Sequence, residues 1–164
     1  MLKIIPSMKE LDFSQLMDVY LEGNQENGQF LFPDMPEGLQ MLHAQQDFYA
    51  YLTQVFYKTK RAAYYVWIQD DLYVAAVRTE PYRDGILISA LETKPSQRGR
   101  GYATKLLHSV CNEHRGRYIY SHVSKQNAAS LRVHKKCGFA IVSDMAVYID
   151  GSVSRNAYTL KIDV

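Results

Sequence analysis

The middle of the chain combines three patterns that strongly constrain its fold. Residues 86–93 begin almost continuously apolar and end before Pro95, which predicts a central strand covered on both faces. A loop with two glycines follows at residues 98–103 (Arg-Gly-Arg-Gly-Tyr-Ala). Apolar side chains then recur at helical spacing, which predicts an amphipathic helix ending near Gly116: Ala103, Leu106, Leu107, Val110 and Cys111. With a further strand at 118–124, these segments predict a right-handed parallel crossover.

The loop between this strand and this helix is suited to binding an anion. Its glycines allow the backbone to approach a ligand closely. The first N–H groups of the helix have no partner within the helix and lie at the positive end of its dipole, so we expect a phosphate there, and a pyrophosphate in particular. Residues 99–105 are not a Walker A sequence, because the four-residue spacer before Gly-Lys is missing, and the glycine spacing differs from the dinucleotide fingerprint.

The rest of the chain adds helices and strands on both sides of this unit. A short strand over residues 2–6 precedes a helix over 12–22, and 39–58 is the strongest helix before the middle of the chain. Residues 23–38 are rich in Gly, Asn and Pro and are predicted as a long loop, a feature that is often functional. The other predicted elements are strands at 62–69, 72–78, 139–148 and 158–163 and a helix at 127–137.

These elements predict an α/β (α+β) fold with the order β-α-α-β-β-β-α-β-α-β-β. Hairpin connections make most strands antiparallel, so we expect a mixed, mostly antiparallel central sheet of about seven strands with helices on both faces. The chain has 164 residues, of which 47% are apolar and 22% charged. This composition fits a single domain, 1–164, with a core of its own.

Charge is unevenly distributed along the sequence. Residues 94–136 carry ten Lys or Arg and one acid, a net charge of +9, whereas the remainder of the chain carries −7. A basic segment around a phosphate-type loop indicates a small polyanionic ligand, and an acidic remainder favours a cationic second substrate. The basic residues are interrupted by apolar positions rather than forming a run, which argues against nucleic acid as a partner.

Targeting and metal-binding patterns are missing from the sequence. No apolar run is long enough to span a membrane, and residues 1–6 have too short an apolar core for a signal peptide, so we expect a cytoplasmic protein with no membrane partner. Cys111 and Cys137 are the only cysteines and are expected to stay reduced. No spacing of His and Cys resembles a zinc site, so no metal is predicted.

A second motif raises the specificity of the glycine loop. Residues 127–139 read Asn-Ala-Ala-Ser-Leu-Arg-Val-His-Lys-Lys-Cys-Gly-Phe. Together the two stretches resemble the GNAT superfamily of acyl-CoA N-acyltransferases. Residues 98–103 match its Q/R-x-x-G-x-G/A motif at every specified position, and 127–139 resemble its N…Lys-x-Gly-Phe segment. The predicted order of elements is also that family's order, and the resemblance is strongest over 86–139.

The resemblance implies how the chain would bind its donor. Acetyl-CoA, the implied co-substrate, would lie in a slot where strands 86–93 and 118–124 splay apart. Backbone N–H groups of the loop would hold the pyrophosphate, and the main chain of the preceding strand would pair with the pantetheine arm and stabilise an oxyanion. The implied binding residues are Leu91, Glu92, Thr93, Arg98, Gly99, Arg100, Gly101, Tyr102, Ala103, Thr104 and Asn127.

At two positions where the family places catalytic side chains, this chain has histidine. Seven residues after Asn127 the family usually has a tyrosine that protonates the CoA thiolate, and this chain has His134. Five residues before Asn127 some members have a glutamate base, and this chain has His122. Histidine can do either job near neutral pH. The alternative is that both are structural, with acids among Tyr82 and Tyr102 and bases among Glu92 and Asp84.

The resemblance implies an N-acetyltransferase that acts by direct attack of a primary amine on acetyl-CoA. The alternative is a catalytically silent acyl-CoA-binding module. We expect a small-molecule or peptide amine as acceptor, and a monomer or homodimer. The acceptor would lie among the 23–38 loop, the 39–58 helix, the turn at Tyr82 and the final hairpin, with three acids available to attract a cation: Glu26, Asp34 and Glu37.

Overall fold

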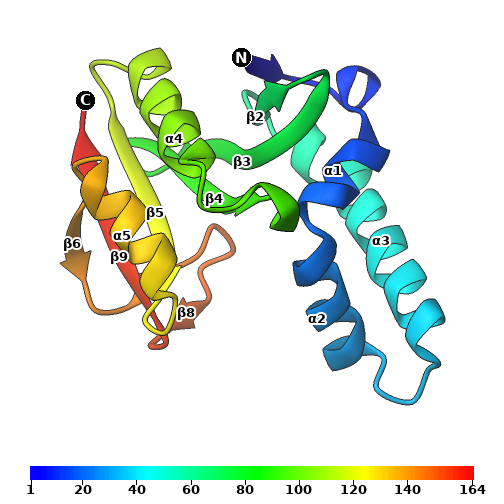
Figure 1. The fold of residues 1–164 in the computed structure, drawn as a ribbon. Coiled ribbons are helices and arrows are strands. Elements are labelled where there is room, and N and C mark those ends of the chain that lie inside the picture. Colours follow the sequence, from blue (N-terminus) through cyan, green and yellow to red (C-terminus); the bar gives the residue numbers. More distant parts are fainter.

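The computed structural model describes residues 1–164, and a seven-stranded sheet runs through it in the order β1-β2-β3-β4-β5-β9-β6 (Figure 1). Strands β4 and β5 are parallel, and every other neighbouring pair is antiparallel. This confirms the predicted mixed sheet and its single parallel crossover. The strands are β1 (Leu2–Ile5), β2 (Ala63–Gln69), β3 (Leu72–Tyr82), β4 (Gly85–Thr93), β5 (Tyr118–Ser124), β6 (Ala140–Ser143) and β9 (Ala157–Asp163).

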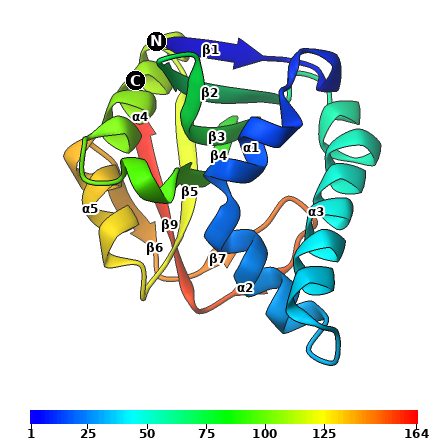
Figure 2. The same ribbon diagram turned by 45° about the vertical axis from the view of Figure 1, so that its right-hand side comes forward.

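Helices cover both faces of the sheet, as predicted (Figure 2). Helices α4 (Tyr102–Glu113) and α5 (Ala128–Lys136) lie on one face, where Leu106, Leu107 and Val110 are fully buried. Helices α1 (Phe13–Val19), α2 (Leu21–Leu31) and α3 (Glu37–Gln54) belong to the other face. None of these helices combines the length and the apolar composition needed to cross a membrane.

Strands β4 and β5 separate after a short paired stretch. Residues 85–88 pair with 118–121, but β4 continues to Thr93 and β5 to Ser124 without pairing to each other. A bulge accompanies the separation, because Ala90 and Leu91 both stand opposite Val77 of β3. Ala90 has a positive φ of 54°, and its carbonyl accepts a 2.5 Å hydrogen bond from the Tyr20 hydroxyl. A bulge bends its strand locally, so this one turns the end of β4 away from β5.

The predicted long loop at residues 23–38 is wrong, because α2 occupies most of it and only 32–36 connect α2 to α3. The helix–helix contact explains the difference. A Cβ on Gly28 would lie 2.7 Å from the carbonyl oxygen of Gln40, so this glycine allows α2 and α3 to approach closely. Asn24 is buried, with its amide 3.3 Å from the Met17 sulfur. Glycine and asparagine therefore serve tertiary packing here, which overrides their low helix propensity.

The predicted strand at 139–148 is divided in the structure. Strand β6 ends at Ser143, whose hydroxyl accepts a hydrogen bond from the Met145 N–H. The chain then leaves the main sheet and forms a separate two-stranded hairpin from β7 (Ala146–Val147) and β8 (Val153–Ser154). We call residues 146–154 the C-terminal hairpin.

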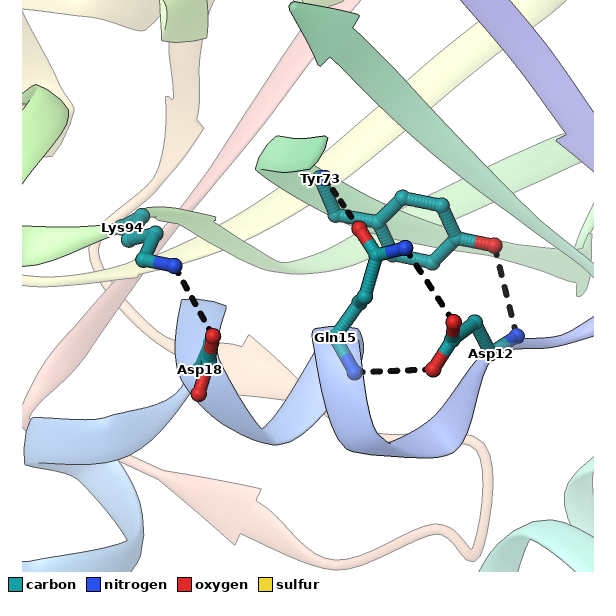
Figure 3. A network of polar contacts seen from close by, with 5 residues as sticks. All are labelled: Asp12, Gln15, Asp18, Tyr73 and Lys94. Atoms are coloured by element: carbon teal, nitrogen blue, oxygen red, sulfur yellow. Dashed lines mark hydrogen bonds and ion pairs between the residues drawn. The ribbon is translucent and has the colours of Figure 1, made fainter. Parts of the chain in front are cut away.

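A polar network holds the first helix against the centre of the sheet (Figure 3). The Asp12 carboxylate caps α1 by accepting the Gln15 N–H at 3.0 Å. The Gln15 side-chain oxygen accepts the Tyr73 N–H at 2.7 Å, and Lys94, just after β4, donates to Asp18 at 2.8 Å. These contacts fix α1, and the α2 helix that follows it, beside the segment that enters the glycine loop.

Candidate functional site

The glycine loop, the end of β4 and the start of α5 enclose a cavity of about 610 Å³, which we call the loop cavity. Ten of the eleven residues predicted to bind the donor line it, and Arg100 does not. The structure thus brings together segments that are more than thirty residues apart in the sequence. The ten are Leu91, Glu92, Thr93, Arg98, Gly99, Gly101, Tyr102, Ala103, Thr104 and Asn127.

The backbone of the loop has the conformation that its glycines permit. Gly99 and Gly101 have φ values of 76° and 78°, and Gly101 is the N-cap residue of α4. No side chain caps this helix, and its first N–H groups lie at the wall of the loop cavity. Their direction and the helix dipole make this wall a site for an anionic group.

Acidic side chains near the loop partly offset its positive charge. Arg98 forms an ion pair of 2.6 Å with Glu22 of α2 and a longer one of 3.8 Å with Glu92. Glu26 also lines the loop cavity. Burial raises the pKa of the Glu92 carboxyl, and the nearby Arg98 opposes this shift. The sequence did not indicate this role for Glu22, because the helix that presents it was predicted to end there.

Asn127 links the loop cavity to the fold of α5. Its side-chain oxygen accepts the Ser130 N–H at 3.0 Å and so caps the helix. Both residues line the loop cavity. The asparagine therefore fixes the position of the α5 wall of the loop cavity.

On the α3 face of the sheet, a second cavity of about 750 Å³ lies against the C-terminal hairpin, and we call it the hairpin cavity. Strands β3, β4 and β5 contribute Glu80, Ser89 and His122, while α3 contributes Tyr51. Tyr148 to Asp150 close it from the hairpin. The separation of β4 from β5 therefore leaves room on both sides of the sheet.

A third cavity, of about 340 Å³, lies between α2, α3 and the sheet, and we call it the helix cavity. It shares Ala90 and Arg78 with the hairpin cavity and Glu92 with the loop cavity. The three cavities thus meet at the β4 bulge. No group of three or more His, Cys, Asp or Glu side chains is arranged to hold a metal ion.

Solved acetyltransferases share this architecture. An N-acetyltransferase from Staphylococcus aureus Mu50 has a TM-score of 0.69 at 16% identity, with 98% of this chain and 100% of that chain covered. The ribosomal-protein-S18-alanine N-acetyltransferase of Escherichia coli has a TM-score of 0.62 at 17% identity, covering 99% and 93%. The PaiA N-acetyltransferase of Thermoplasma acidophilum, solved with coenzyme A, has a TM-score of 0.64 at 11% identity, with 100% of this chain and 99% of that chain covered.

At such low sequence identities, structural similarity establishes only the fold. Membership of a family is established by the match to a sequence-family model. The model of the acetyltransferase (GNAT) family matches residues 26–139, which include both motifs. The chain belongs to the GNAT family of acetyltransferases. This GNAT protein is accordingly an acyltransferase enzyme. A comparison with curated protein sequences gives no match.

In this GNAT enzyme His134 is buried, with an exposed fraction of 1%. Its Nδ1 lies 2.8 Å from the Ser130 carbonyl oxygen and its Nε2 lies 2.9 Å from the Ser121 hydroxyl. A carbonyl oxygen only accepts, so Nδ1 carries the proton and Nε2 accepts from Ser121. Burial lowers the pKa of His134, which favours this neutral form. The side chain joins α5 to β5 and does not line the loop cavity.

His122, in contrast, lines the hairpin cavity, and one of its ring nitrogens is unpaired. Its Nε2 is buried and has no hydrogen-bond partner. The ring stands edge-on to Tyr82 and Tyr148, with centroids 5.6 and 5.1 Å away. Burial lowers the pKa of His122, and the charge of Arg83 lowers it further. A neutral imidazole with an unused nitrogen has the properties of a proton acceptor.

The other candidate acids and bases do not all lie in one cavity. The Tyr82 hydroxyl donates to the Val147 carbonyl, and Tyr102 lines the loop cavity. Asp84 accepts a 2.6 Å hydrogen bond from Tyr120 and lines none of the three cavities. Of the two alternative bases, only Glu92 lies at the junction of the cavities.

Two charged residues of β3 were missed in the sequence. Arg78 and Glu80 both line the hairpin cavity, and the Arg78 guanidinium lies over the ring of Tyr51 at 5.1 Å. Burial raises the pKa of Glu80, and Arg78 opposes this shift. The available signal was two charged residues, spaced by two, in a strand of otherwise apolar character, since that spacing puts both on one face.

Proposed function

We propose that this enzyme is an N-acetyltransferase that moves the acetyl group of acetyl-CoA to a primary amine. The loop cavity would hold the donor, and the hairpin cavity would hold the acceptor. The observation that carries the proposal is the meeting of these cavities at the β4 bulge, where β4 and β5 separate. Two similar structures, the Thermoplasma acidophilum protein and a Bacillus acetyltransferase, were solved with coenzyme A, which supports this donor.

The donor-binding residues follow from the lining of the loop cavity. Backbone N–H groups of residues 98–104 would bind the pyrophosphate, because the open N-terminus of α4 offers unpaired donors and a favourable dipole. The main chain of Leu91, Glu92 and Thr93 would orient the thioester. After the bulge these residues have no partner strand in β5, so their outward backbone groups are available for the pantetheine arm and the oxyanion.

In the reaction, the ammonium would first lose one proton to solvent, and the neutral amine nitrogen would then attack the thioester carbonyl directly. A C–N bond forms, the C–S bond breaks, and the second proton of the attacking nitrogen passes to a base. We assign this base to His122, because one of its ring nitrogens has no partner and its lowered pKa keeps the ring neutral. The sulfur can leave as a thiolate, because the pKa of a thiol, about 8.5, lies close to neutral pH.

The acid role predicted for His134 stays a prediction, and its contacts favour a different role. Both ring nitrogens are used within the protein, and the neutral ring has no opening toward the loop cavity. We infer that His134 positions α5 against β5 and so supports the wall formed by Ser130 and Val133. The thiolate then has no acid at the position of the family tyrosine.

The missing tyrosine is also the observation that favours the second candidate, a module that binds acyl-CoA without turning it over. Release of CoA distinguishes the two. Purified protein is incubated with acetyl-CoA and a panel of amino acids, polyamines, aminoglycosides and short peptides, and free thiol is measured. Amine-dependent release from the wild type that is lost in His122→Gln supports the enzyme. Binding of acetyl-CoA without release from any amine supports the silent module.

The proposal includes a cytoplasmic location, where acetyl-CoA is available and where Cys111 and Cys137 stay reduced. Both cysteines are buried as free thiols, and burial raises the pKa of Cys111 to about 11, which makes it unreactive. Titration of the native protein with a thiol reagent tests this part: two thiols should appear only on unfolding.

A further inference from the structure

Arg78 is a partly buried cation at the point where the acceptor would meet the donor. It lies on β3 on the α3 face of the sheet, paired in register with Tyr64 of β2 and with Ser89 of β4. Ser89 immediately precedes the bulge residue Ala90. Arg78 and Ala90 both line the helix cavity and the hairpin cavity. The side chain is therefore a wall of the acceptor side, next to the reacting centre.

The Arg78 guanidinium has no anion within the protein. The ion pairs of the structure involve Lys94 and Arg98 only, so neither Glu80 nor any other carboxylate lies within 4.0 Å of it. Its Nε is buried and makes no hydrogen bond. The rings of Tyr51 and Phe56, at 5.1 and 5.8 Å, hold the guanidinium by stacking but offer its N–H groups no acceptor in their plane.

A charge that is partly withdrawn from water and has no partner is costly, and such groups are normally paired. The guanidinium can donate several hydrogen bonds. A carboxylate is the ligand that matches this group, because it accepts several hydrogen bonds and binds a guanidinium through two parallel ones.

We propose that the acceptor is a free amino acid whose carboxylate is bound by Arg78 while its amino group lies at the β4 bulge. This inference rests on the proposed N-acetyltransferase function and names its substrate class. Arg78 pairs in register with Ser89, the neighbour of the bulge residue Ala90, and this placement on adjacent strands fits an amine and a carboxylate on the same carbon or close to it. Two acids on the hairpin cavity, Glu80 and Asp150, complete a site of mixed charge that suits a zwitterion.

A free amino acid differs from the other amines considered because it carries a carboxylate close to its amine. Polyamines and aminoglycosides carry no carboxylate, and a peptide N-terminus has an amide in its place. None of these would satisfy the guanidinium. A site built around a partly desolvated charge discriminates against ligands that leave the charge unpaired.

The first test compares matched acceptors. The wild type, saturated with acetyl-CoA, is assayed for thiol release with each free amino acid, its amide and its methyl ester. The amide and ester have less basic amines, so a larger fraction of each is unprotonated and able to react near neutral pH. A carboxylate site nevertheless predicts that kcat/KM for the best amino acid exceeds that for its amide by about 10²-fold. Equal or higher kcat/KM for the amide would overturn the inference.

The second test changes the cation. Arg78→Met should abolish the preference by lowering kcat/KM for the amino acid about 10²-fold while that for the amide changes little. Arg78→Lys keeps the charge but loses the planar fork, so its kcat/KM for the amino acid should lie between those of the wild type and Arg78→Met. Lys161→Met is the matched control, because Lys161 also lies over an aromatic ring, that of Tyr118, but lines none of the cavities. It should leave the preference intact.

Acetyl-CoA titration of every variant distinguishes failure of the carboxylate site from failure of the proposed function. Unchanged donor affinity in Arg78→Met shows that the variant is folded, so an equal loss of activity toward acid and amide would contradict the carboxylate site. Titration of the CoA-bound wild type with the best amino acid gives a readout without turnover, and the affinity should be lost in Arg78→Met. Failure of the wild type to bind acetyl-CoA would instead contradict the proposed function itself.

Discussion

The conformation of Gly101 leads to a quantitative prediction for the donor site. Its φ of 78° lies in the left-handed region, and a Cβ built on it would meet nothing within 4 Å. Alanine at this position is therefore strained without being crowded by the protein. The left-handed region costs a residue with a side chain roughly 1–2 kcal/mol. The free energy of unfolding of Gly101→Ala should fall by about this amount if the loop keeps its conformation.

The same strain sets the upper limit for the loss of donor affinity. If the variant loop relaxes, binding must restore the strained conformation, which weakens affinity by at most about 1–2 kcal/mol, or roughly 5- to 30-fold. A larger loss means that the new methyl group itself meets the phosphate. Gly101→Val should show this larger loss, because a β-branched side chain is still less compatible with a positive φ and is bulkier.

Gly116 supplies the matched control at the other end of α4. Its φ is 80° and its Cβ position is also open, but it lines none of the three cavities. Gly116→Ala should lose similar stability in a urea titration and keep the acetyl-CoA affinity measured by calorimetry. If neither Gly101→Ala nor Gly101→Val binds acetyl-CoA more weakly than Gly116→Ala, the glycine loop does not approach the donor and the assignment of the loop cavity is refuted.

Four further outcomes are expected. His122→Gln should lower kcat by about 10²- to 10⁴-fold with unchanged acetyl-CoA affinity, and a rate equal to the wild type in steady-state assays would exclude His122 as the base. His134→Phe should lose about 1–3 kcal/mol of stability in urea titrations, because the Ser121 and Ser130 partners are left unpaired, while turnover stays near that of the wild type; a selective loss of kcat would instead support the acid role. Burial lowers the folded-state pKa of His134, so the unfolded chain binds more protons than the folded one at acidic pH. The free energy of unfolding should therefore fall as pH drops below about 6.5, the pKa of an unfolded histidine. A smaller pH dependence in His134→Phe would show that His134 is the group responsible. Gly28→Leu should separate α2 from α3 and lower the melting temperature, since its Cβ would lie 2.7 Å from a backbone oxygen, and an unchanged melting temperature would show that the helices do not pack as described.

The part of the fold around the loop cavity could be predicted because its determinants are local. A continuous apolar strand, two glycines and an amphipathic helix follow one another within about thirty residues, and the family motifs mark the same segment. The sheet order and the parallel crossover then follow from general connection rules. Asn127 was expected at the cavity from the resemblance, and its capping bond to Ser130 is a local interaction of the same kind.

The surroundings of the hairpin cavity and the helix cavity could not be predicted, because they depend on contacts between distant segments. The helix at 21–31 is stabilised by the close approach of Gly28 to α3, which no local pattern of Gly and Asn indicates. Arg78 and His122 come together only once β3 and β5 lie on either side of β4. His134 illustrates the same limit, since its position in the motif indicated an acid and its packing against β5 favours a structural role.

The central claim is that this protein transfers an acetyl group, and thiol release with product analysis tests it most directly. Wild-type protein, acetyl-CoA and the amino acid panel are incubated together, and free CoA and acetylated amine are both quantified. The account predicts that they appear in equal amounts, at a rate that depends on the amine and is greatly reduced in His122→Gln. Donor binding without release of CoA above the protein-free rate for any amine would contradict it.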